Sequence, residues 1–194
     1  MQTFPEFYSI PTKIDRDVAE LMIKKCETLS LQQSEVFDGV TDKDSPLNVH
    51  YKTRQSLNGW IPTDHWISGI MKHLIEVANT ELFHYDISAW SDQIQYTLYD
   101  QVNSHYTWHH DICESSFRSD FVRKLSISLL LSDPDDYEGG EFQLMLLGKE
   151  KMITFKPALG TAIIFPSTAK HRVRPIKSGK RISLVGWYGG PPFR

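Results

Sequence analysis

The chain has 194 residues, of which 40% are hydrophobic and 23% charged, and its net charge is −3. This length and composition are typical of a single soluble globular domain, and the net charge gives no general attraction for nucleic acid. No apolar run is long enough to span a membrane, and the first residues lack the layout of a secretory signal. With only Cys26 and Cys113, a disulfide framework is not expected, so we predict a cytoplasmic protein.

The first part of the chain is predicted to form supporting helices. Apolar residues recur at helical spacing over residues 14–29, and a second amphipathic helix is expected to begin near Pro62–Thr63. Between them, residues 33–59 are polar and rich in turn formers, which predicts a long loop with a short strand around Val49–Lys52.

From about residue 93 the pattern changes to short β-prone runs separated by turn signals. The runs are IQYTLY, LSISLLL, EFQLMLL, KMITF, TAIIF, HRVRPI and RISLVGWY. Short strands at this spacing predict a double-stranded β-helix, or jelly roll. The predicted fold is therefore α+β and mainly β, as a single domain over residues 1–194. Residues 1–92 would supply helical support and loops, and residues 93–190 the jelly-roll core.

The stretch YTWHHDI contains residues that can bind a metal. In an extended strand, His109 and Asp111 share one face and His110 takes the other. His171, at the start of HRVRPI, is the natural third ligand from a distant strand. Two imidazoles and one carboxylate with open coordination positions are typical of non-haem Fe(II) oxygenases. A closed four-ligand zinc site would leave no position for a chelating cosubstrate and O₂.

A carboxylate-binding pair follows the third histidine. Arg181 and Ser183 lie two residues apart on the predicted strand RISLVGWY, so their side chains share a face with Val185 and Trp187. Arginine binds carboxylates bidentately and stays charged. A keto acid with two carboxylates could bind iron at one end and this pair at the other, which is the geometry that 2-oxoglutarate requires.

The combined pattern YTWHHD…FPSTAKHRVRPIKSGKRISLVGW resembles the Fe(II)/2-oxoglutarate-dependent oxygenases, and most closely their prolyl/lysyl hydroxylase branch (prolyl 4-hydroxylase-like). The resemblance implies that His109, Asp111 and His171 hold the metal and that these three and Arg181 are the catalytic residues. It implies Fe(2+) and 2-oxoglutarate as cofactors, O₂ as cosubstrate and ascorbate as a reductant. The implied activity (EC 1.14.11) hydroxylates a peptidyl-proline of a protein or peptide substrate, with succinate and CO₂ as coproducts.

One feature departs from the animal prolyl hydroxylases, which place a tyrosine from the strand after the metal pair near the tail of 2-oxoglutarate. The equivalent run SISLLL offers only Ser126, Ser128 and Leu130 on its inner face. Tyr99, with Tyr106 behind it, is therefore expected to provide the second contact to the cosubstrate beside Arg181 and Ser183.

Other readings of the sequence remain open. A zinc hydrolase could use the same three ligands with Glu114 as its base. A hydroxylase of a small molecule or free amino acid would share every residue of the site. A nucleic-acid dealkylating oxygenase is less favoured because it would need a basic, aromatic surface. Residues 112–124 and 36–60 are expected to frame the substrate, and Arg54 and Trp60 in the second segment could touch it. His110 is expected to face outward or line the pocket edge, and Trp187 to pack in the core in preference to forming a substrate platform.

Overall fold

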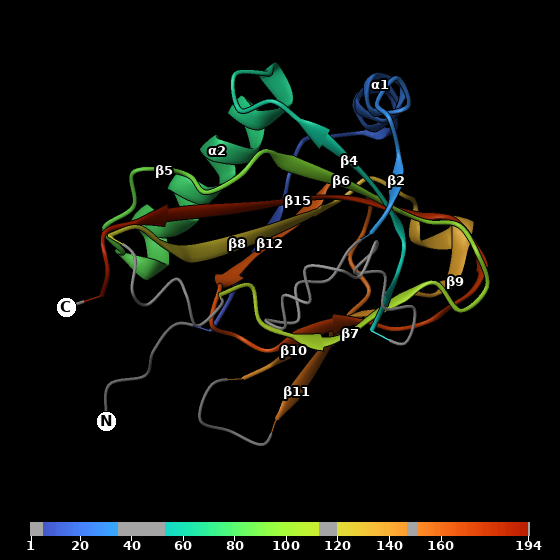
Figure 1. Cartoon of the computed structure of the whole chain (residues 1–194). Helices are drawn as coiled ribbons and strands as arrows, with labels where there is room; N and C mark the ends of the chain where they lie inside the picture. The colour runs from blue at the N-terminus through green and yellow to red at the C-terminus, as the bar shows by residue number, and fades with distance from the viewer. Residues whose placement is uncertain (1–5, 35–52, 113–119, 147–150, 194) are drawn as a thin grey trace, which may run out of the picture.

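The computed structural model describes residues 6–34, 53–112, 120–146 and 151–193. Two antiparallel sheets face each other, and the two α-helices lie on the outer side of the larger sheet (Figure 1). The larger sheet has the order β1-β12-β8-β15-β6-β4-β2 with β5 beside β15, and the smaller has the order β11-β10-β13-β7-β3. Strands β9 and β14 form a separate pair.

The strands are short, as their sequence spacing predicts. Their bounds are β1 Tyr8–Pro11, β2 Gln32–Gln33, β3 Arg54–Gln55, β4 Leu57–Ile61, β5 Ala89–Trp90, β6 Ile94–Tyr99, β7 His105–His109, β8 Val122–Leu130, β9 Tyr137–Gly139, β10 Phe142–Met145, β11 Met152–Phe155, β12 Thr161–Pro166, β13 His171–Val173, β14 Ile176–Gly179 and β15 Arg181–Gly190. The prediction of a mainly β, double-sheet core is confirmed.

The helices support the larger sheet. Helix α1 spans Arg16–Cys26, and the Asp15 side chain caps it by accepting a hydrogen bond from the Val18 backbone N–H. Helix α2 spans Trp66–Ala78 and continues into the π-helix η1 (Asn79–Phe83), while a short 3₁₀ helix, η3, spans Pro134–Asp136. None of the described helices is long and apolar enough to cross a membrane.

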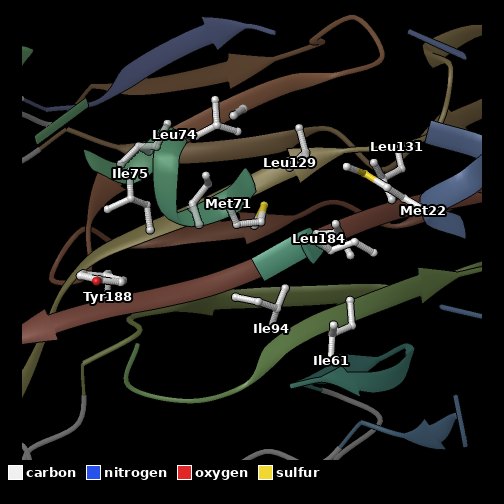
Figure 2. Close-up of a cluster of buried hydrophobic side chains, with 14 of the residues drawn as sticks. Met22, Ile61, Met71, Leu74, Ile75, Ile94, Leu129, Leu131, Leu184 and Tyr188 are labelled. Atoms are coloured by element: carbon white, nitrogen blue, oxygen red, sulfur yellow. The ribbon is translucent and has the colours of Figure 1, made fainter. Parts of the chain in front are cut away.

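The main apolar core lies between the helices and the larger sheet. Figure 2 shows Met71, Leu74 and Ile75 of α2 beside Leu129 of β8 and Leu184 of β15. A second cluster fills the space between the two sheets at Phe142, Leu144, Ile163 and Phe165, among others. Full burial of each such side chain stabilises the fold by roughly 1.5–3 kcal/mol. The helices thus hold the larger sheet rigid behind the residues that face the smaller one.

Two parts of the expected secondary structure need correction. Strand β3 and the first part of β4 lie within residues 33–59, which were predicted as loop. Strand β4 pairs with β6 from Leu57 opposite Leu98 to Ile61 opposite Ile94. The polar residues that suggested a loop, Ser56 and Asn58, are buried. The run HRVRPI divides into β13 and β14 around Pro175, which has no N–H to give to a sheet. The strand expected around Val49–Lys52 lies outside the described residues.

Replacing either of two glycines by alanine should change the free energy of unfolding, with opposite signs at the two positions. Gly160 has φ +76°, and a Cβ there would lie 2.2 Å from the backbone oxygen of Ile14. We expect Gly160→Ala to lower the free energy of unfolding by about 2 kcal/mol. Gly69, inside α2, has no atom within 4 Å of its would-be Cβ, so Gly69→Ala should raise stability by about 0.5–1 kcal/mol. Urea denaturation measures both, and equal stability of the two variants would contradict this account.

Candidate functional site

The site is built on the pair of strands β7 and β13. His109, the last residue of β7, lies directly opposite His171, the first residue of β13, and their ring centroids are 4.1 Å apart. Asp111 follows two residues after His109, where its backbone N–H donates to the carbonyl oxygen of Ser167, 3.0 Å away. One ligand atom from each of these three residues lies within 4.8 Å of the others. The predicted convergence of the three side chains is confirmed.

Local hydrogen bonds orient both imidazoles. Nδ1 of His109 donates to the carbonyl oxygen of Thr107 at 2.8 Å, and Nδ1 of His171 donates to that of Ala169 at 3.0 Å. Because a carbonyl only accepts, the proton is on Nδ1 and the lone pair on Nε2. The two Nε2 atoms lie 3.8 and 3.5 Å from the carboxylate oxygens of Asp111. Each ring therefore presents its free nitrogen to the carboxylate.

The protonation states suit a bound cation. Burial and the neighbouring His171 lower the pKa of His109 to about 3, so this imidazole is neutral at physiological pH. Burial alone would raise the pKa of Asp111, but His171 and His109 more than offset it, and the pKa lies below its usual value. The side chains of Ser126 and Trp187 lower this pKa further, by smaller amounts. Oδ2 of Asp111 is buried and has no hydrogen-bond donor among the described residues. A buried carboxylate oxygen without a donor is costly, and a metal ion would satisfy it. The set fits Fe(II).

A β-bulge adds an aromatic ring to the site. His171 opposes His109 and Val173 opposes Tyr106, so three residues of β7 span the distance of two on β13. Tyr106 consequently faces inward together with His109, and their rings stack at 3.5 Å with an interplanar angle of 14°. On the other face of Tyr106 lies the guanidinium of Arg54, 4.5 Å from the ring centroid.

Arg181 is buried at the start of β15, only 3% exposed. Its Nη1 donates to Oγ of Ser183 at 3.0 Å, and its guanidinium lies 5.7 Å from the ring centroid of Tyr99, its partner on β6. Burial raises the pKa of Tyr137, and the nearby charge of Arg181 partly offsets this. No carboxylate of the described residues pairs with Arg181, so its charge is available to a ligand.

A cavity of about 760 Å³ joins these groups. Its lining includes the three residues of the histidine–aspartate set as well as Tyr99, Arg181, Ser183, Val185 and Trp187. The prediction that residues 181, 183, 185 and 187 share a face is thereby confirmed. Trp187, expected to pack in the core in preference to forming a substrate platform, is buried and also lines this cavity, and the guanidinium of Arg123 lies 4.4 Å from its ring centroid.

The remaining predicted positions are of three kinds. His110 is exposed, as expected, and its Nδ1 bonds to the carbonyl oxygen of Thr168. Glu114, Cys113 and most of the two substrate-framing segments lie outside the described residues. Arg54 and Trp60, which the sequence offered as loop residues that could touch substrate, both line the cavity, and Arg54 is 6% exposed. The sequence did not predict that Arg54 lies on a strand; the alternation of polar residues at 54, 56 and 58 is the signal that could have shown this.

Comparisons with known proteins now add to this geometry. The family model described as the 2OG-Fe(II) oxygenase superfamily matches residues 94–189. This β core belongs to that superfamily. The family implies Fe(2+) and 2-oxoglutarate as cofactors, as predicted from the sequence, and the geometry of His109, Asp111 and His171 fits iron binding.

The curated relatives are similar over the same region. A PKHD-type hydroxylase of Synechococcus sp. (strain CC9902) is 45% identical over 87 residues, which are 45% of this chain and 37% of the relative. A PKHD-type hydroxylase of Colwellia psychrerythraea is 48% identical over 63 residues, 32% of this chain and 27% of the relative. The matches thus span about a third of the length of these curated relatives.

Solved structures show the fold over nearly the whole chain. A Pseudomonas putida prolyl-4-hydroxylase superposes with a TM-score of 0.68 at 19% identity, covering 96% of this chain and 94% of its own. A Trichoplax adhaerens prolyl hydroxylase in complex with a hypoxia inducible factor peptide fragment gives a TM-score of 0.72 at 18% identity, covering 94% and 83%. These likenesses confirm the predicted double-stranded β-helix fold.

The metal site can be tested without turnover. We expect His109→Ala and Asp111→Ala to lose Co(II) binding, measured anaerobically from the visible absorption of the bound ion, because each removes one of three ligands. His110→Ala is the matched control, since its side chain is exposed and bonds to Thr168. Unchanged Co(II) affinity in the first two variants would rule out this ligand set.

Proposed function

We propose that the protein is an Fe(II)- and 2-oxoglutarate-dependent dioxygenase that hydroxylates an unactivated C–H bond of a peptidyl-proline in a protein, with succinate and CO₂ as coproducts. The observation that carries this proposal is the buried Arg181 without an acidic partner among the described residues, lining the same cavity as two histidines and one carboxylate. A zinc hydrolase with the same ligands would have no use for that guanidinium.

In this proposal each residue has a defined task. His109, Asp111 and His171 would hold Fe(II), which together with 2-oxoglutarate and O₂ supplies the oxidising power that protein side chains lack. Arg181 binds the far carboxylate of 2-oxoglutarate, and Ser183, which accepts from its Nη1, keeps the guanidinium in place. Tyr99 packs against Arg181 and lies within reach of the same carboxylate.

The cavity walls position the substrate and exclude water. Trp187 and Trp60, whose ring centroids are 6.4 Å apart, form an aromatic wall on the larger sheet. Arg123 is stacked on Trp187 and is fixed by hydrogen bonds to Ser91, to the carbonyl oxygen of Asp111 and to Asp92. Such a wall holds an apolar ring such as that of proline over the metal position by packing.

The choice of a protein substrate has separate support. The structural neighbour from Trichoplax adhaerens holds a peptide fragment, and the likeness to it covers 94% of this chain. The principal alternative is a hydroxylase of a small molecule or free amino acid. We further propose a cytoplasmic location, consistent with a buried, unpaired Cys26, and ascorbate as a reductant of the iron.

The role of Arg181 predicts a specific kinetic change. Arg181→Ala should raise the KM for 2-oxoglutarate at least about tenfold, because a charge-assisted pair with a carboxylate is worth roughly 1.5–3 kcal/mol. Arg174→Ala, which removes an exposed arginine paired with Glu141, should leave this KM unchanged. Succinate formation measured against 2-oxoglutarate concentration gives both values. An equal KM in wild type and Arg181→Ala would show that the guanidinium does not bind the cosubstrate.

Turnover tests the proposed reaction directly. The iron-loaded protein, incubated with 2-oxoglutarate, ascorbate and a panel of proline-containing peptides, should release succinate and add one oxygen atom to a proline, detected by mass spectrometry. A parallel panel of free amino acids examines the alternative. Failure to form succinate under every condition would remove the oxygenase assignment, whereas oxidation of free amino acids alone would replace the protein substrate.

A further inference from the structure

Arg54 provides a second buried cation in the cavity. It lies on β3, opposite Tyr106 of β7, outside the residues matched by the family model. Its side chain donates through Nε to Oγ of Ser56 and through Nη2 to Oδ1 of Asn58, each at 3.1 Å. Both acceptors are neutral, and no carboxylate of the described residues pairs with Arg54. A buried guanidinium without an anion is energetically costly.

The position of Arg54 relates it to the reacting centre. Its guanidinium covers one face of Tyr106, whose other face stacks on the imidazole of His109. Arg54 is therefore separated from the first metal ligand by a single aromatic ring. Arg181, in contrast, lies on the opposite sheet beside Tyr99. A molecule bound at Arg54 would reach the metal from a different side than the cosubstrate.

Besides Arg54, a hydrogen-bond donor that has no acceptor among the described residues lines the same cavity. Nε2 of Gln33, on β2, is buried and has no hydrogen-bond partner among the described residues. Strand β2 pairs with β4, and Ser34 next to Gln33 bonds to Ser56, the acceptor of Arg54. Within the described part of the chain, strands β2, β3 and β4 thus present to the cavity a cation without an anionic partner and an amide N–H without an acceptor. A bound anion would satisfy both of these groups.

We propose that Arg54 binds a carboxylate of the substrate, and hence that this enzyme selects substrates with a carboxylate close to the hydroxylated carbon. The inference rests on the proposed oxygenase function and names the substrate class. A guanidinium recognises a carboxylate through two parallel N–H···O bonds, and the amide of Gln33 can give a further one. The carboxylate comes either from an acidic side chain next to the target proline or from the α-carboxylate of a small amino acid derivative.

Paired probes that differ only in charge test this inference. Binding is measured by calorimetry to protein loaded with Fe(II) and 2-oxoglutarate in the absence of oxygen. The peptide pairs carry glutamate or glutamine on each side of one proline, and the small pair is N-acetyl-L-proline and N-acetyl-L-prolinamide. We expect the carboxylate member of at least one pair to bind wild type about tenfold more tightly than its amide. The pair that shows the preference identifies the source of the carboxylate.

Variants assign the preference to Arg54. The preference for the carboxylate member of a probe pair should disappear in Arg54→Gln, be partly retained in Arg54→Lys, and remain intact in Arg174→Gln. Unchanged Co(II) affinity of Arg54→Gln would verify that Tyr106 and His109 keep their places. Equal binding of both members of every pair to wild type, binding of no probe, or a preference that survives in Arg54→Gln would each overturn the inference.

Failure of this inference is distinguishable from failure of the proposed function. Substrate-independent conversion of 2-oxoglutarate to succinate needs the metal and Arg181 but no substrate carboxylate, so wild type should show this conversion whether or not the carboxylate preference exists. If this conversion occurs while no carboxylate preference exists, only the role of Arg54 fails. If it is absent from wild type, the oxygenase assignment itself fails.

Discussion

The antiparallel pairing of β7 with β13 is the constraint on which the rest of the site depends. It brings His109 and His171, 62 residues apart in the sequence, to directly opposite positions. In both residues the ring N–H bonds to the carbonyl two residues earlier in the same chain segment, so the backbone of each strand sets the orientation of its own imidazole. Asp111 is held beside them because its backbone N–H bonds to the carbonyl oxygen of Ser167, directly after β12. The ligand geometry is thus determined by main-chain pairing and not by contacts among the ligands themselves.

Much of this arrangement could be predicted from the sequence because it depends on strand periodicity. A His-x-Asp pair on an extended segment must share a face, and so must Arg181 and Ser183 on β15. The long apolar runs of β8, β12 and β15 are buried on both sides by the helices and the opposite sheet, which made them recognisable as core strands. The distances in sequence between these strands then limited which side chains could lie close together. For these elements the local pattern and the tertiary environment agree.

The rest could not be predicted because local pattern and tertiary environment disagree there. Simple alternation puts Tyr106 on the opposite face of β7 from His109, and only the bulge opposite Val173 brings the two rings together. A bulge depends on the partner strand and leaves no mark in a single sequence. Likewise, Ser56 and Asn58 have the composition of a loop, yet both are buried in or beside strands, and Asn58 lines the cavity. Polar residues on a buried strand face are typical of a binding site, where function overrides strand propensity.

The charged residues that line the cavity do not balance one another. Among its described lining residues, the charged groups are Arg54, Arg123 and Arg181 with Asp92 and Asp111. Arg123 is neutralised by Asp92, which leaves two guanidiniums and one carboxylate facing the interior. A divalent metal ion at Asp111 raises the positive excess to three units, and the two carboxylates of 2-oxoglutarate reduce it to one. The residual unit lies at Arg54, on the sheet opposite Arg181. Because a buried excess charge is costly, the cofactor-loaded cavity is electrostatically incomplete until an anion binds there, and this makes the substrate itself a part of the charge balance.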